Sequence, residues 1–322
     1  MEIVPKEITF ATAALTGFNR NRYRLETSGA TQAGPSSIVT ITLPSNAVID
    51  LKSIRIHMDV ETFSHTIPAV PANATTGAAA VPAATVHAKL PADAHSLLSH
   101  VEVYAGGIQL TQSCSEYNTV ANILKIVRST KDRDQTVDHV LGHGMIDNAD
   151  EQERDTSIVM TDFKGFLGES STRYLPTSIT GDITLRLTFA PQSVLAFKES
   201  GKDVGADFSA QGITAASLIK PYAVKNIFAT CDTVALGDAY EKMLLDRLSS
   251  EAFLPVNFKE YYTFAQHGLS TPSHSTKFNL SCSSIDACYA VFRDQNYQTN
   301  GIKSRPYRIT GSGDGTVANA FF

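Results

Sequence analysis

The chain is poor in several features that would restrict its function. It has no tryptophan, only four cysteines in 322 residues, and 27 basic against 32 acidic side chains. So few cysteines in so long a chain do not form a disulfide framework, and a net charge of -5 lacks the basic excess typical of nucleic-acid-binding proteins. No apolar run reaches the roughly 18 residues that indicate a membrane-spanning helix. Contact with a genome or a membrane would therefore need a local basic patch.

Motifs for catalysis and metal binding are also lacking. His139 and His143 have the spacing of a helical metal site, but Val140 stands where a zinc protease helix has its general-base glutamate. The acidic stretch 147–155 lacks the spacing of a calcium-binding EF-hand loop, and the glycine-rich stretch 311–315 lacks the lysine of a phosphate loop. We therefore expect no enzyme activity, no cofactor and no metal site.

Alternation of apolar and polar residues is the strongest signal in the sequence. In the segment 48–60, the side chains from Ile54 to Val60 alternate between apolar residues and Arg55, His57 and Asp59, which predicts a strand with one buried face. Further strands are expected at 38–43, 183–189, 224–236, 253–264 and 277–292, and short helices at 115–127 and 238–249. The stretch 101–110 is expected to form two short strands joined by a hairpin at Gly106-Gly107. Many short strands with one or two short helices predict an all-β sandwich or barrel.

Three stretches interrupt this pattern. Residues 62–93 are rich in alanine, proline and threonine and show neither a helical nor a strand period, which indicates a long surface insertion. Residues 1–34 contain a short basic run with Arg20, Arg22 and Arg24, and the polar residues 197–222 are typical of a linker. The chain is thus expected to comprise an N-terminal arm (1–34), a first β domain (35–196), a linker (197–222) and a second, shorter β domain (223–322).

Three stretches of the chain have the order and pattern of a known family. In the first, 51–60 is followed after the insertion by Ser-Leu-Leu-Ser-His-Val-Glu-Val-Tyr-Ala-Gly-Gly-Ile at 96–108 and by Glu116-Tyr117. The second is 173–187, and the third runs from 227 to 292. This order resembles the double jelly-roll major capsid proteins of tailless icosahedral viruses, the lineage of adenovirus hexon and the internal-membrane bacteriophages. The resemblance spans about residues 37–292, although only about 100 residues remain for the second roll.

The resemblance implies an architecture and a role. The fold would be two tandem antiparallel jelly-roll sandwiches, and three copies would form a pseudo-hexagonal homotrimer that tiles a virion shell. Its partners would be neighbouring capsomers and minor capsid proteins, with assembly in the host cytoplasm and no small-molecule substrate. The insertion 62–93 would then be an outer tower or a contact between subunits, and Arg20, Arg22 and Arg24 would contact an internal membrane or the genome at the inner face.

A jelly-roll carbohydrate-binding or spike (receptor-binding) protein is the alternative. Such a protein would show an exposed aromatic platform or a calcium site at one end of a sheet. The lack of tryptophan counts against it, because sugar-binding platforms favour that side chain.

Overall fold

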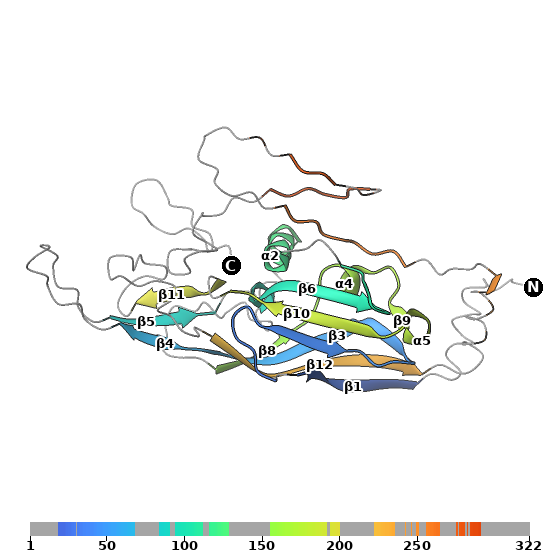
Figure 1. Cartoon of the computed structure of the whole chain (residues 1–322), viewed down its shortest axis with the longest axis horizontal. Helices are drawn as coiled ribbons and strands as arrows, with labels where there is room; N and C mark the ends of the chain where they lie inside the picture. Colours follow the sequence, from blue (N-terminus) through green and yellow to red (C-terminus); the bar gives the residue numbers. More distant parts are fainter. Residues whose placement is uncertain are drawn as a thin grey trace, which may run out of the picture.

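The computed structural model describes residues 19–29, 31–67, 84–90, 94–111, 116–128, 155–191, 194–199, 222–235 and 256–264, with shorter stretches between 242 and 290. Its main feature is a nine-stranded sheet in which every pairing is antiparallel (Figure 1). The strands are β1 (Asn19–Ser28), β2 (Ile38–Thr42), β3 (Val48–Thr62), β6 (Leu98–Ala105), β7 (Ile108–Gln109), β8 (Asp155–Met160), β9 (Tyr174–Pro176), β10 (Ile183–Phe189) and β12 (Tyr222–Ala235). The fold is thus mostly β, as the alternation predicted.

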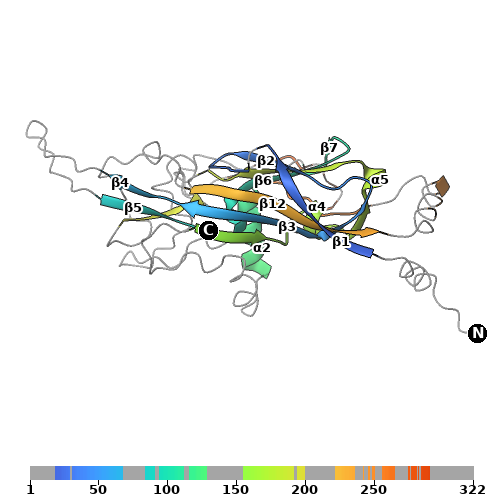
Figure 2. The same cartoon turned by 90° about the horizontal axis from the view of Figure 1, so that it is seen from below.

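The sheet curls into two layers that are joined by β1. The first layer has the order β7-β6-β10-β2, and the second has the order β1-β12-β3-β8 with β9 also paired to β3. Over residues 19–26 β1 pairs with β12, and at Thr27 and Ser28 it pairs with β2. One strand therefore belongs to both layers, and the result is a jelly-roll-like sandwich (Figure 2).

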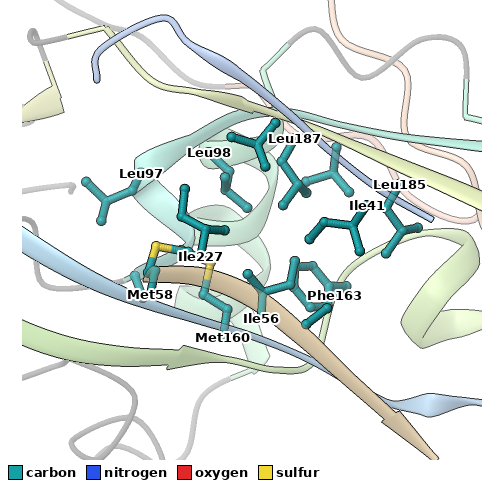
Figure 3. Packing of buried hydrophobic residues seen from close by; sticks show 14 of the residues in the cluster. Ile41, Ile56, Met58, Leu97, Leu98, Met160, Phe163, Leu185, Leu187 and Ile227 are labelled. Atoms are coloured by element: carbon teal, nitrogen blue, oxygen red, sulfur yellow. The ribbon is translucent and has the colours of Figure 1, made fainter. Parts of the chain in front are cut away.

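The core lies between the two layers. In β10 every second residue from Ile183 to Phe189 is buried, and β3 shows the same alternation from Ile54 to Val60, so both predicted strands are confirmed. Figure 3 shows side chains of the first layer facing those of the second, with Ile41, Leu185 and Leu187 on one side and Ile56, Met58 and Ile227 on the other. Such a dry, interdigitated layer is what two amphipathic sheets form when they pack face to face.

Short helices pack against the sandwich. They are η1 (Ala94–Leu97), α2 (Tyr117–Arg128), α4 (Phe166–Glu169) and α5 (Thr177–Thr180). The helix predicted at 115–127 is confirmed as α2, which packs beside η1 and β6. The predicted Gly106-Gly107 hairpin is confirmed between β6 and β7, and both glycines have a positive φ. The helix predicted at 238–249 lies almost entirely outside the described residues.

A separate three-stranded sheet extends one end of the sandwich. It consists of β4 (Ser64–Ile67), β5 (Ala84–Lys89) and β11 (Ala196–Glu199) in the order β11-β5-β4. The expectation that 62–93 contains no strand is therefore wrong. The two strands of the insertion, β4 and β5, consist largely of small and polar residues. Apolar and polar positions therefore do not alternate clearly enough in their sequence to predict a strand.

The two ends of the long strand β12 mark the two ends of the molecule. Tyr222, its first residue, pairs with Thr62 at the start of the insertion, and Ala235, its last, pairs with Asn19 at the start of β1. At about 3.4 Å per residue, 14 residues separate these points by roughly 45 Å. The three-stranded sheet and the start of β1 therefore lie at opposite ends of the sandwich (Figures 1 and 2).

Two segments lie elsewhere than the domain division places them. Residues 19–28 of the expected arm form β1, and β12, expected to open the second domain, lies between β1 and β3 in the main sheet. The physical reason is that Val224, Ile227 and Ala229 turn an apolar face to the core of this sandwich, so β12 is buried together with the strands of the first domain. The described residues contain one sandwich. Residues 256–264 run beside it, with Val256 and Phe258 against the core.

Candidate functional site

The outer face of the second layer carries the three arginines that the sequence predicts as a contact site. Strand alternation places Arg20, Arg22 and Arg24 on one face of β1. The register then sets Arg22 opposite Asp232 and Arg24 opposite Thr230 of β12. The basic run predicted from the sequence is therefore a row of side chains along a sheet surface.

Asp50 of β3 and Asp232 of β12 are the unusual members of this face. They are direct partners across the two strands, and their side chains are 0% and 5% exposed. Two carboxylates facing each other in a sheet repel, and burial makes each charge costly unless it is paired. The two carboxylates can therefore be buried side by side only if cationic side chains pair with them.

Three arginines supply those cations. Arg20 donates from Nε and Nη2 to Asp232 Oδ2 at 3.0 and 2.6 Å, and its Nη2 also lies 3.3 Å from Asp50 Oδ2. Arg22 Nε donates to Asp232 Oδ1 at 2.7 Å. Arg173, just before β9, donates from Nε and Nη2 to the two oxygens of Asp50 at 3.0 and 2.9 Å. We call these five residues the Arg–Asp cluster.

The cluster joins three strands and the segment before β9, and its three arginines and two aspartates leave one surplus positive charge. It connects β1, β12, β3 and the segment that leads into β9, so it ties together neighbouring strands of the second layer. Hydrogen bonds from Arg22 and then Arg20 lower the pKa of Asp232 below its usual range and outweigh its burial. The three arginine side chains remain 43%, 63% and 51% exposed, so the excess charge faces solvent.

An irregularity in β3 positions the two carboxylates. The register between β3 and β12 shifts between Thr230 and Asp232, which leaves extra residues of β3 between Asp50 and Arg55. Ser53 fills this bulge: its Oγ donates to the Asp50 carbonyl at 2.6 Å and accepts from the Asp232 backbone N–H at 2.8 Å. The backbone N–H of Lys52 donates to Asp50 Oδ1 at 3.2 Å.

A stack of three side chains lies next to the cluster on the same face. The ring of Phe228 is parallel to the imidazole of His57, with centroids 4.6 Å apart, and the guanidinium carbon of Arg24 lies 3.8 Å from the centroid of the Phe228 ring. Because β12 lies between β1 and β3, Phe228 is held between Arg24 and His57. Burial, followed by the nearby arginine charges, lowers the pKa of His57.

The sequence identified part of this site. It pointed to Arg20, Arg22 and Arg24, which the structure places together, but it missed Asp50, Asp232 and Arg173. A weak signal was present at Asp50, which stands between the apolar residues Ile49 and Leu51 of β3. His139, His143 and the stretch 311–315 lie outside the described residues, as does the acidic stretch 147–155 apart from Asp155.

No group of three or more potential metal ligands occurs among the described residues, and none of their helices is long and apolar enough to cross a membrane. Of the cysteines in this part of the chain, Cys282 and Cys288 are exposed. Cys231 is buried, which raises its thiol pKa to about 12.

Comparison with known proteins gives structural matches alone. No protein-family model and no curated protein matches the chain. The structure is similar to VP54 of the virus PBCV-1, fitted into a cryo-EM reconstruction of the virophage Sputnik, with 12% identity and a TM-score of 0.41. It is also similar to a quasi-atomic model of the PBCV-1 virus capsid, with 11% identity and a TM-score of 0.41. Each match covers 70% of this chain and 44% of the other, so the chain matches less than half of those proteins.

Proposed function

We propose that this protein is a double jelly-roll major capsid protein, whose copies form pseudo-hexagonal homotrimers that tile a virion shell. The observation that supports this most is the curled antiparallel sandwich. Its long strands run from an end that carries the three-stranded sheet to an end where β1 begins. The order of motifs in the sequence, which resembles that family, supports it independently. In this proposal the protein acts by packing against copies of itself and not by catalysis.

The two ends of the sandwich fit an upright orientation in a shell. β1 begins at one end of the sandwich, and the three-stranded sheet of the insertion lies at the other end. With the strands upright, these features would face opposite sides of the shell. The β4–β5–β11 sheet would then be the outer tower, and the start of β1 would face the inside.

Within 256–290 the described residues expose large apolar side chains, among them Tyr262, Phe264, Phe278 and Ile285. Phe264 and Phe278 stack with ring centroids 5.1 Å apart. Exposed aromatic side chains in this number are expected where another surface packs against them. They support a contact with neighbouring capsomers or minor capsid proteins.

The purified protein should be a trimer in solution. Permanent complexes of this kind bury more than about 2,000 Å² between subunits, so the trimer should persist at micromolar concentration. Size-exclusion chromatography with light scattering would measure the mass, and electron microscopy would show whether the particles are pseudo-hexagonal. A stable 34.7 kDa monomer at that concentration would contradict the proposal.

We also propose that Arg20, Arg22 and Arg24 contact anionic lipid or the genome on the inner side. Their partly exposed guanidinium groups and the surplus positive charge of the Arg–Asp cluster support this.

Arg24→Ala is the substitution that tests this contact. Arg24 pairs with the exposed Glu26 and with no buried carboxylate, so its removal should leave the fold intact. We expect the variant to bind anionic lipid vesicles and duplex DNA several-fold more weakly than the parent protein in low salt. Neutral vesicles are the control. Equal binding by parent and variant would refute a contact through Arg24.

A further inference from the structure

β1 is attached to the sandwich differently from the other long strands. Eight of its ten residues are exposed and none is fully buried, whereas β3, β10 and β12 each bury a full apolar face. Leu25 alone packs, partly buried, against the core. Removing β1 would thus expose little apolar surface.

Main-chain pairing and charge hold β1 in place. It pairs with β12 along eight residues, from Asn19 opposite Ala235 to Glu26 opposite Phe228. Arg20 and Arg22 then bind the buried carboxylates of Asp232 and Asp50. These carboxylates form a receptor for an extended strand that carries arginines two residues apart. An identical strand from another copy would make the same contacts.

The connection after β1 contains a natural hinge. Gly29 has a φ of +110°, a conformation that glycine adopts without strain, and no atom lies within 4 Å of the position where a Cβ would be. Four residues later Ala33 is fixed, because its backbone N–H and carbonyl both bond to Val224 at 2.8 Å. The chain can therefore turn at Gly29 while everything from Ala33 onward keeps its place.

We propose that β1 is exchanged between copies, so that in the assembled protein the β1 of one copy lies against β12 and the Asp50–Asp232 pair of its neighbour. The charge complementarity of arginine row and carboxylate pair selects a second copy as the occupant. Because the exchanged strand re-forms the contacts that it leaves, exchange costs little beyond the hinge rearrangement. The inference rests on the proposed function, since it requires that copies assemble.

Tyr23→Cys gives a direct test, because residue 23 lies opposite the native Cys231. The assembled full-length variant would be oxidised with diamide and run on a denaturing gel without reductant, and the linked peptides would be identified by mass spectrometry. We expect disulfide-linked dimers and trimers. Tyr23→Cys with Cys231→Ser is the control for bonds through the other cysteines.

A second cysteine pair tests the same contact in case the geometry of the first pair does not allow a disulfide. Asn21→Cys with Thr233→Cys, in a Cys231→Ser background, joins another pair of direct partners. An oligomer whose disulfides are all within one chain would overturn the exchange and leave the capsid proposal standing. Absence of a disulfide at both pairs would overturn it as well, since β1 would then not lie beside β12. A monomer in light scattering would overturn the capsid proposal and the exchange together.

Discussion

Phe189→Ala should lower the free energy of unfolding by about 3–5 kcal/mol, one of the two largest effects that we expect from a change in this protein. Phe189 ends β10, is fully buried and belongs to the core between the two layers. Truncation removes the ring from an apolar site and leaves a cavity that the paired strands on either side cannot close. The backbone bond from its N–H to Ser37 does not depend on the side chain and should remain.

Equilibrium denaturation in urea, followed by circular dichroism, would measure this loss. Arg186→Ala is the matched control, because Arg186 lies on the outward side of the same strand and pairs with Glu102 at 3.5 Å. An exposed pair of this kind is worth about 0–1 kcal/mol. Equal effects of the two substitutions would mean that the face of β10 assigned to the core is not buried in solution.

The strands that the sequence predicted share a local signal. In β3 and β10 apolar residues alternate with polar ones over six or more positions, and each strand's burial can be inferred without knowing its neighbours. The hairpin at Gly106-Gly107 is local as well, because the turn itself requires two residues with positive φ. The alternation of side chains and the turn sequence were therefore sufficient to predict these elements.

What the sequence could not supply depends on pairing between distant segments. The place of β12 between β1 and β3 follows from long-range register, and so does the meeting of Arg20 with Asp232, which are 212 residues apart. Before the pairing is known, an aspartate on the outward face of a strand is expected to be exposed to solvent, and nothing local indicates that neighbouring strands bury it. The buried carboxylate pair therefore became visible only in three dimensions.

The Arg–Asp cluster changes what should follow from removing the arginines. From the sequence alone, replacing Arg20, Arg22 and Arg24 should impair assembly and leave the sandwich folded. In the structure, two of the three neutralise buried carboxylates, so their loss leaves charge behind in the sheet. A defect in assembly after such a change would then report on folding as much as on contact with lipid or nucleic acid.

Arg20→Ala with Arg22→Ala should accordingly lower the free energy of unfolding, and by clearly more than Arg24→Ala does, because it leaves the buried carboxylate of Asp232 without a cation. Removing one partner of a fully buried ion pair is strongly destabilising, and the partial exposure of both arginines reduces that loss. Adding Asp232→Asn should recover much of the loss, because a neutral amide no longer repels Asp50. Urea denaturation of the three proteins would measure both steps, with Arg24→Ala as the control that leaves the carboxylates paired.

The same loss should depend on pH with a defined sign. The pKa of Asp232 is lowered in the folded protein, so its pairing stabilises the fold above the ordinary aspartate pKa of about 3.9 and is lost as the pH falls through the folded value. The difference in unfolding free energy between the parent protein and the double arginine variant should therefore narrow below about pH 4. A difference that stays constant from pH 6 to pH 3 would mean that the arginines stabilise β1 by packing alone. In that case Asp232→Asn would give no recovery, and the two measurements together decide whether charge or packing holds β1 on the sandwich.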